Sequence, residues 1–281
     1  MRINLQNPTE FSDERKKEVP SELYDENYYL NLAGGYDLYA KTHGTELDPR
    51  GKSVLDLIKS NTQTKVLDIG IGRGEFLKAI LREQKGFAVG MDYSAASLNI
   101  AKDTLHKETM LGRCHLIRGN AISLPFARST FDFITMLDVV EHLYPHQLME
   151  CFVECRRVLK DSGKLLIHTF PNKLCWNYGY PVVRIITNLW RKNTSEKLPK
   201  NPRTDYDKIL HVNEQTRWSL KSALKKAKFN HVKVWEEFPN PTPFMHFLVR
   251  GGSWKRRFFF KFISLPLLKS IFYNDIYAIA D

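Results

Sequence analysis

Cysteine is scarce in this sequence and follows no metal-binding or disulfide pattern. Its 281 residues include only Cys114, Cys151, Cys155 and Cys175, and no two of them form a C-x-x-C pair. This spacing predicts neither a zinc site nor a disulfide framework, so we expect reduced thiols and no bound metal.

A signal peptide and a membrane-spanning run are missing as well. The first 18 residues are polar and include acids, which is not typical of a secretory signal. The most apolar run, 258–272, is interrupted by Lys261, Pro266 and Lys269, and it is shorter than the roughly 20 residues that a spanning helix needs. We therefore expect a cytoplasmic protein, with peripheral membrane contact as an option.

Acidic residues are outnumbered, and the formal net charge is +11. Between Arg184 and Lys228 there are twelve Lys or Arg residues against four Asp or Glu residues, and a second basic cluster follows at 250–261. Such a surface suits nucleic acid, an anionic membrane, a phosphorylated substrate or plain solvation. Bases and aromatic residues alternate at 250–272, which predicts peripheral membrane contact there.

Apolar runs and helical patterns alternate along the chain, which predicts an α/β fold with a parallel sheet and helices on both faces. There is neither an internal repeat nor a low-complexity tract. Hydrophobic content of 43% supports one large domain with insertions. We expect strands at 65–69, 87–92, 114–118, 133–137, 164–169, 230–236 and 274–280, helices at 53–60, 75–81, 94–102, 147–159 and 216–228, and a turn at 161–163.

A glycine turn joins the first strand to its helix. Gly70, Gly72 and Gly74 allow positive φ angles and a close approach to a ligand, and the amides of the following helix would face that ligand. A dinucleotide fingerprint requires a third glycine at position 75, where this chain has Glu75. This departure argues against a nicotinamide-dependent oxidoreductase.

Polar residues stand at the carboxyl ends of the predicted strands, where ligands bind in open α/β sheets. Asp92, 18 residues after Gly74, is placed to accept hydrogen bonds from ribose hydroxyls. The other residues at such ends are Asp68, Asn120, Asp138 and His168.

Four segments together resemble the class I S-adenosylmethionine-dependent methyltransferases. They are the Asp-x-Gly-x-Gly-x-Gly turn at 68–74, Leu-Pro-Phe at 124–126, Asp-Val-Val-Glu-His at 138–142 and Arg-Val-Leu-Lys-Asp-Ser-Gly at 157–163. The resemblance covers about residues 55–170 and is best for the ubiquinone-biosynthesis and sugar O-methyltransferase branches.

The resemblance implies a Rossmann-like, doubly wound fold with a seven-stranded, mostly parallel sheet, an antiparallel last strand and lid insertions. It also implies S-adenosylmethionine as the cofactor, with the glycine turn beside its methionine portion. Many members have an acid where Asn120 stands, but an amide oxygen can still accept a hydrogen bond from adenine. The implied cofactor-binding residues are Asp68, Gly70, Gly72, Gly74, Asp92, Tyr93, Asn120, Ala121 and Asp138.

We divide the chain into four parts: an N-terminal arm and aromatic cap at 1–50, a cofactor-binding core at 51–172, a substrate-side insertion at 173–215 and a C-terminal part at 216–281. The last part includes a basic, aromatic insertion at 239–273. Five tyrosines between residues 24 and 39 could close over a ligand or pack their rings on the core.

The function implied is methyl transfer, most simply O-methylation of a small or lipid-linked metabolite such as a saccharide intermediate. A hydroxyl acceptor profits from a general base with a near-neutral pKa, and His142, His168 and His211 qualify by position. The alternatives are N-methylation of a small amine, nucleic-acid methylation and a regulator that binds the cofactor without catalysis. Residues 138–141 lack the Asn/Asp-Pro-Pro-aromatic motif of base-amino methyltransferases, which argues against nucleic acid. The motifs specify neither the acceptor nor the oligomeric state.

Overall fold

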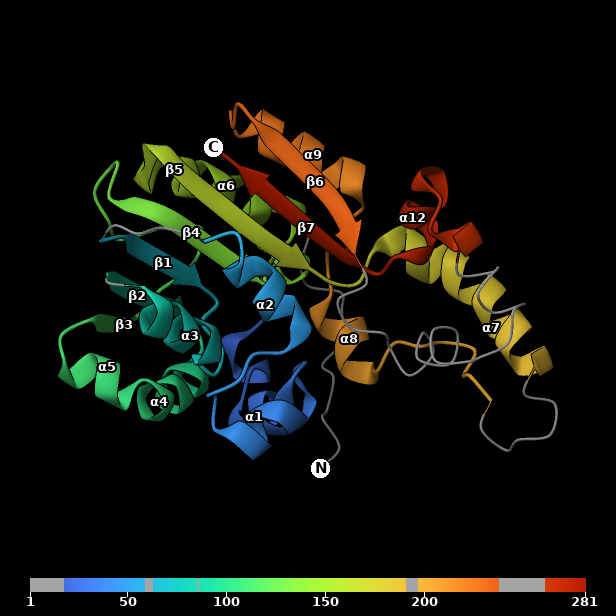
Figure 1. The fold of residues 1–281 in the computed structure, drawn as a ribbon, viewed down its shortest axis with the longest axis horizontal. Coiled ribbons are helices and arrows are strands. Elements are labelled where there is room, and N and C mark those ends of the chain that lie inside the picture. Colours follow the sequence, from blue (N-terminus) through green and yellow to red (C-terminus); the bar gives the residue numbers. More distant parts are fainter. Residues whose placement is uncertain (1–17, 59–62, 85, 191–196, 238–260) are drawn as a thin grey trace, which may run out of the picture.

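A single sheet forms the centre of the computed structural model, which describes residues 18–58, 63–84, 86–190, 197–237 and 261–281. Its seven strands run in the order β3-β2-β1-β4-β5-β7-β6 (Figure 1). The first five strands of the chain are parallel, and β7 is antiparallel to both β5 and β6, which confirms the predicted Rossmann-like sheet. The strands are β1 Lys65–Ile69, β2 Phe87–Asp92, β3 Cys114–Arg118, β4 Phe131–Leu137, β5 Leu159–Thr169, β6 Val232–Glu237 and β7 Asp275–Ala280.

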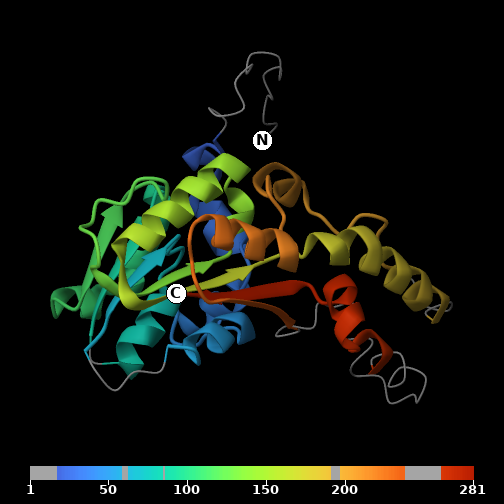
Figure 2. The same cartoon turned by 90° about the horizontal axis from the view of Figure 1, so that it is seen from above.

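Strand residues alternate between two apolar cores because successive side chains of a strand point to opposite faces. In β5, Leu165 and Ile167 enter one core while Leu166 enters the other. Helices therefore cover both faces of the sheet (Figure 2). One face carries α6 Pro145–Val158 and α9 Arg217–Lys226, and the other carries α2 Pro49–Leu55, α3 Glu75–Glu83 and α4 Ala95–Thr104.

The remaining elements lie beside these layers or beyond the carboxyl ends of the strands (Figures 1 and 2). No helix in the described part of the chain is long and apolar enough to span a membrane. The elements outside the layers include the short helices η3 Ser21–Leu23, η5 Val140–His142, α1 Tyr36–Thr42, α5 His106–Met110 and α8 Asp205–Leu210. They also include the π-helical turns η4 Tyr28–Leu32 and η6 Cys175–Gly179, and the helices α7 Tyr180–Trp190 and α12 Pro266–Phe272.

Two predicted boundaries were wrong for identifiable reasons. Helix α2 starts earlier than predicted because the Asp48 carboxylate caps it, accepting a hydrogen bond from the Gly51 amide at 2.8 Å. The turn expected at 161–163 lies within β5, whose pairing with β4 shifts register there. That irregularity lets the extra residues bulge out without ending the strand.

Several predictions fall on parts outside the described residues. These parts include residues 1–17 of the predicted arm, and residues 239–260 of the predicted basic insertion with its Trp254–Phe260 run.

Helix α6 offers a matched test of the core that covers the first face. Phe152 is fully buried, whereas its neighbour Val153 is 53% exposed. We expect Phe152→Ala to lower the free energy of unfolding by about 3–5 kcal/mol, because it leaves a cavity under the sheet. Val153→Ala should stay within about 0.5 kcal/mol of the native protein in the same chemical denaturation experiment. Equal losses in both variants would contradict this account of the core.

Candidate active site

The ends of β1, β2 and β4 open onto a cavity of about 740 Å³. The N-terminal segment and the 204–211 segment complete its wall. Among the predicted site residues, Gly74 alone does not line this cavity. Those that do are Asp68, Gly70, Gly72, Asp92, Tyr93, Asn120, Ala121, Asp138, His142, His168 and His211.

The three glycines of the turn, Gly70, Gly72 and Gly74, have positive φ angles of 73°, 54° and 84°. Their surroundings differ. A Cβ on Gly70 would collide with Val139, and one on Gly74 would press on Ala101 in helix α4. A Cβ on Gly72 would meet only a Tyr29 ring carbon, at 3.9 Å. Gly72 is therefore the glycine that keeps cavity space open for a ligand, while Gly70 and Gly74 serve packing.

Two buried carboxylates brace this turn. Asp68 accepts a 2.6 Å hydrogen bond from the Thr135 hydroxyl, and burial raises the pKa of its carboxyl to about 7. Asp92 accepts hydrogen bonds from the Ser97 hydroxyl at 2.8 Å and from the Gly72 amide at 3.3 Å. Burial also raises the pKa of Asp92. Asp92 thus positions the turn in addition to facing the cavity.

Asn120 and Tyr93 connect the cavity wall to the N-terminal segment. The Asn120 amide donates to Glu18 at 3.0 Å, and its oxygen accepts from the Ile122 amide at 3.2 Å. The Tyr93 hydroxyl donates to the carbonyl of Val19 at 2.9 Å. The Asn120 oxygen predicted to contact adenine therefore already has one partner, and one lone pair is left for a ligand.

Sequence reasoning missed Arg73, which lies inside the glycine turn. Its guanidinium donates to the Tyr29 carbonyl at 2.9 Å and to the Gly34 carbonyl at 2.7 Å, and it pairs with Glu75 at 2.6 Å. Its basic side chain between Gly72 and Gly74 was the sequence signal that could have pointed to this residue. Arg73 ties the tyrosine-rich segment to the turn.

The tyrosine-rich segment packs its rings together and also lines the cavity. Tyr24 and Tyr29 are buried in an apolar cluster with Leu210, and they also line the cavity. The Tyr24 ring lies edge-on to His142, with 5.5 Å between ring centroids.

A chain of charges crosses the floor of the cavity. Asp138, with φ at 54°, lies 2.6 Å from His168 Nδ1 and 3.2 Å from the Arg50 guanidinium. His168 Nε2 lies 2.9 Å from Asp275. Burial alone would lower the pKa of His168, but the carboxylates of Asp138 and Asp275 outweigh burial and raise it to about 10. Burial would raise the pKa of Asp138, but His168 and Arg50 hold it below its usual range.

This network argues against His168 as the base among the three predicted histidines. Both ring nitrogens face carboxylates, so the imidazole is protonated at neutral pH and has no lone pair to offer. His168 instead holds Asp138 in place. Arg50 and Asp275 were missed because they lie 88 and 107 residues from their partners.

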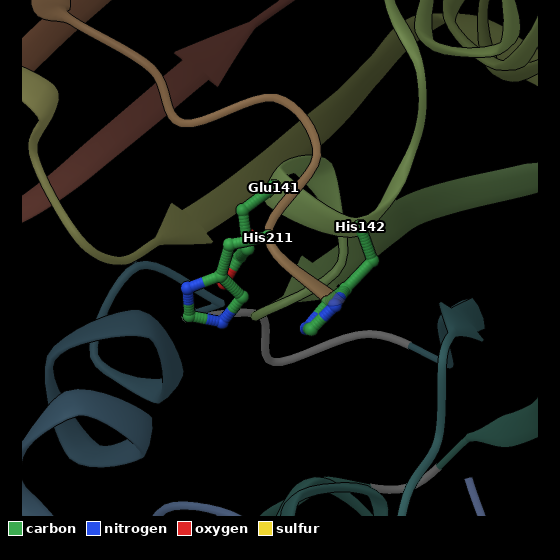
Figure 3. A group of neighbouring side chains, drawn as sticks. All are labelled: Glu141, His142 and His211. Atoms are coloured by element: carbon green, nitrogen blue, oxygen red, sulfur yellow. The ribbon is translucent and has the colours of Figure 1, made fainter. Parts of the chain in front are cut away.

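The other two histidines form a neutral pair (Figure 3), with 5.0 Å between their ring centroids. His142 Nδ1 lies 3.1 Å from the Leu210 carbonyl, so it donates there and Nε2 keeps its lone pair. Burial, and then His211, lower the pKa of His142 to about 3. Burial also lowers the pKa of His211, whose buried Nδ1 has no hydrogen-bond partner.

Glu141 lies beside this pair (Figure 3). It accepts a 2.7 Å hydrogen bond from Thr169, and burial together with Asp138 raises its pKa to about 8. One ligand atom from each of Glu141, His142 and His211 lies within 4.8 Å of the others, so these residues could hold a metal ion. The cysteine pattern predicted no metal, and the 138–142 motif contained Glu141 without indicating its closeness to His211.

Comparison with known proteins finds a methyltransferase domain in this chain. A family model described as a methyltransferase domain matches residues 66–163, from β1 into β5. A demethylmenaquinone methyltransferase of Lactiplantibacillus plantarum is 28% identical over 226 residues, which are 73% of this chain and 91% of that protein. Together with the fold, these matches support a class I S-adenosylmethionine-dependent methyltransferase.

Other relatives of this methyltransferase agree. A ubiquinone/menaquinone biosynthesis C-methyltransferase of Vibrio cholerae is 26% identical over 59% of this chain and 64% of its own length. A Haemonchus contortus phosphoethanolamine N-methyltransferase, solved with S-adenosylmethionine, has the same fold with a TM-score of 0.59 at 18% identity. The superposition covers 91% of this chain and 59% of the Haemonchus contortus chain.

S-adenosylmethionine is the cofactor, and the cavity of the methyltransferase fits it. The turn leaves room at Gly72, while Asp92 and Asn120 offer oxygen acceptors to a nucleoside on the same wall. The rings of Tyr29 and Tyr93 add apolar surface for the remainder.

Gly72 can be tested against a glycine in a similar conformation outside the cavity. Gly112 has φ at 67°, and a Cβ there would meet nothing within 4 Å. We expect Gly72→Val and Gly112→Val to pay a similar backbone cost, about 1–2 kcal/mol. Gly72→Val alone should abolish cofactor binding, because the side chain fills cavity space. Isothermal titration calorimetry with S-adenosylmethionine measures this, and retained affinity in Gly72→Val would refute the cavity assignment.

The His168 network makes stability depend on pH. Because the folded pKa of about 10 exceeds the ordinary 6.5, the stabilising contribution is complete below pH 6.5 and is lost as pH rises towards 10. We expect the stability difference between the native protein and His168→Gln to shrink over this interval, by at most about 1.4 kcal/mol per pH unit. Chemical denaturation from pH 6 to 10 measures the difference. A difference independent of pH would mean that His168 is neutral.

Proposed function

We propose that this methyltransferase methylates a small or lipid-linked acceptor with an acidic hydroxyl group, and that His211 is the general base. The observation that carries the proposal is the neutral histidine pair in the cavity, in which His211 Nδ1 is buried and unpartnered. A group of this kind can accept a proton from a hydroxyl at hydrogen-bond distance.

His211 suits the role better than the other two histidines. His168 already carries its proton between two carboxylates. His142 has a pKa of about 3, and one of its ring nitrogens is hydrogen-bonded to the Leu210 carbonyl. Asp207 lies 3.9 Å from His211 Nε2, so its charge stabilises the imidazolium that forms when His211 takes a proton.

The rest of the cavity is assigned to the cofactor. The turn from Asp68 to Gly74 borders the methionine portion, Asp92 accepts from the ribose, and Tyr93, Asn120 and Ala121 border the adenine. S-adenosylmethionine supplies an activated methyl group, so the protein chiefly has to align the acceptor with it. Asp138 contributes by holding the loop that carries Glu141 and His142, because Arg50 and His168 fix its carboxylate.

The lowered pKa of the base favours acceptors whose hydroxyl group is acidic. A histidine with a lowered pKa removes a proton readily from a phenol or enol, but poorly from a saccharide alcohol, which is a far weaker acid. The tyrosine rings 24, 28 and 206 beside the pair suit a planar, apolar acceptor. A phenolic or enolic acceptor therefore replaces the saccharide as our first candidate.

The oxyanion formed in this way can take the methyl group on oxygen, as expected from the sequence, or on the adjacent conjugated carbon. The relatives from L. plantarum and V. cholerae are named as a demethylmenaquinone methyltransferase and a C-methyltransferase, which favours the carbon. Methylation of an amine would need positioning alone and no base.

Activity of variants on a panel of acceptors separates these chemistries. With hydroquinones, catechols, saccharides and amines, and with labelled S-adenosylmethionine, we expect turnover of phenolic acceptors and carbon-methylated products by mass spectrometry and NMR. His211→Asn should lower kcat about 10²–10⁴-fold while the cofactor still binds, because proton acceptance is lost. The rate of the native enzyme should rise with pH through the pKa of His211 and then level off.

His231→Asn is the matched control, because the His231 side chain is 89% exposed and pairs with Asp281, next to the ends of β6 and β7. It should keep full activity. Activity of the native enzyme on amines and not on phenols, retained in full by His211→Asn, would replace the proposal by N-methylation. Loss of activity with EDTA that Mn²⁺ or Zn²⁺ restores would assign Glu141, His142 and His211 to a metal instead of proton transfer.

A further inference from the structure

Helices α7 and α12 form an arm outside the two cores of the sheet. Val183 of α7 packs on Ile263, Phe272 and Tyr273, which makes a small separate core. In both views the two helices project beyond the end of the sheet (Figures 1 and 2). We define the α7–α12 arm as residues 173–190, 197–202 and 261–274.

One face of α7 is apolar and open to solvent. Val182, Ile185 and Leu189 of α7 continue the helical spacing of Tyr178 in η6, and the four side chains are 44–62% exposed. The opposite face is buried, with Val183 and Thr187 at its centre. At the start of α12, Phe262 and Leu265 are also about half exposed. The arm therefore presents apolar residues that the described part of the chain does not cover.

The charged side chains in the described residues of the α7–α12 arm are all basic. The α7–α12 arm contains no Asp or Glu, and the ion pairs among the described residues include none of its bases. Next to the apolar face, a shallow recess is lined by Arg184, Ile185, Asn188, Leu189 and Lys197. The six bases of the arm are Lys173, Arg184, Lys197, Lys200, Lys261 and Lys269.

We propose that the α7–α12 arm docks on an anionic membrane surface. An exposed apolar stripe flanked by bases is the chemistry of a helix that lies in the lipid interface, where apolar side chains enter the acyl boundary and bases meet lipid phosphates. The recess between Arg184 and Lys197 places two cations beside Ile185 and Leu189, which suits a phosphate headgroup with its chain alongside. Residues 250–260 of the membrane contact predicted from the sequence lie outside the described residues, so the proposal rests on other residues.

Flotation of the full-length protein with vesicles tests the docking. We expect binding to vesicles of phosphatidylcholine and phosphatidylglycerol (7:3), little binding to phosphatidylcholine alone, and weaker binding as salt rises. Ile185→Asp/Leu189→Asp should weaken the binding at least about tenfold, because both side chains lose their apolar contact. Lys197→Glu/Lys200→Glu should also weaken it roughly tenfold or more.

The matched control is Met110→Asp/Leu111→Asp, which changes two exposed apolar residues on the far side of the sheet. It should bind vesicles as the native protein does, and unchanged cofactor binding shows that each variant is folded. Three results would overturn the proposal. They are no flotation with anionic vesicles at low salt, equal flotation of Ile185→Asp/Leu189→Asp and the native protein, and a concentration-dependent dimer in sedimentation that this double variant abolishes.

Discussion

The ion pair between Asp138 and His168 joins the end of β4 to the end of β5, and Arg50 and Asp275 extend it to α2 and β7. Buried charges are costly unless each is paired, so these four residues stabilise one another only when all four elements are in place. Asp138 also adopts a positive φ, which only a well-determined surrounding holds in a residue other than glycine. The short helix after β4, which carries Glu141 and His142, takes its position from this network.

The same fold produces opposite titration behaviour in histidines that lie close together. His168 has a carboxylate against each ring nitrogen and a raised pKa, while His142 and His211 lie side by side near aromatic rings and have lowered pKa values. Burial disfavours the charged form in all three, and only at His168 do directly paired carboxylates outweigh it; Asp207, 3.9 Å from His211, does not. The cavity floor therefore carries paired charges, whereas the two histidines of the wall have lowered pKa values.

The cavity is assembled from parts of the chain that are distant in sequence. Arg73 holds the N-terminal segment on the glycine turn, and Asn120 and Tyr93 hold the same segment on the strand ends. The tyrosine rings therefore belong both to the core and to the cavity wall. Beyond this shared wall the α7–α12 arm has its own small core.

The sequence by itself determined the sheet and the glycine turn, and the resemblance of its motifs to a known family indicated the cofactor. Short apolar runs make the strands, and glycine adopts the positive φ angles at 70, 72 and 74 at the least cost. Tertiary structure decided in which direction the pKa of each histidine shifts, because the shift depends on Arg50, Asp275 and Asp207, which are distant in sequence but close in space. It also decided that Gly72 faces the cavity whereas Gly74 packs on α4, since identical residues in one motif differ only in what surrounds them.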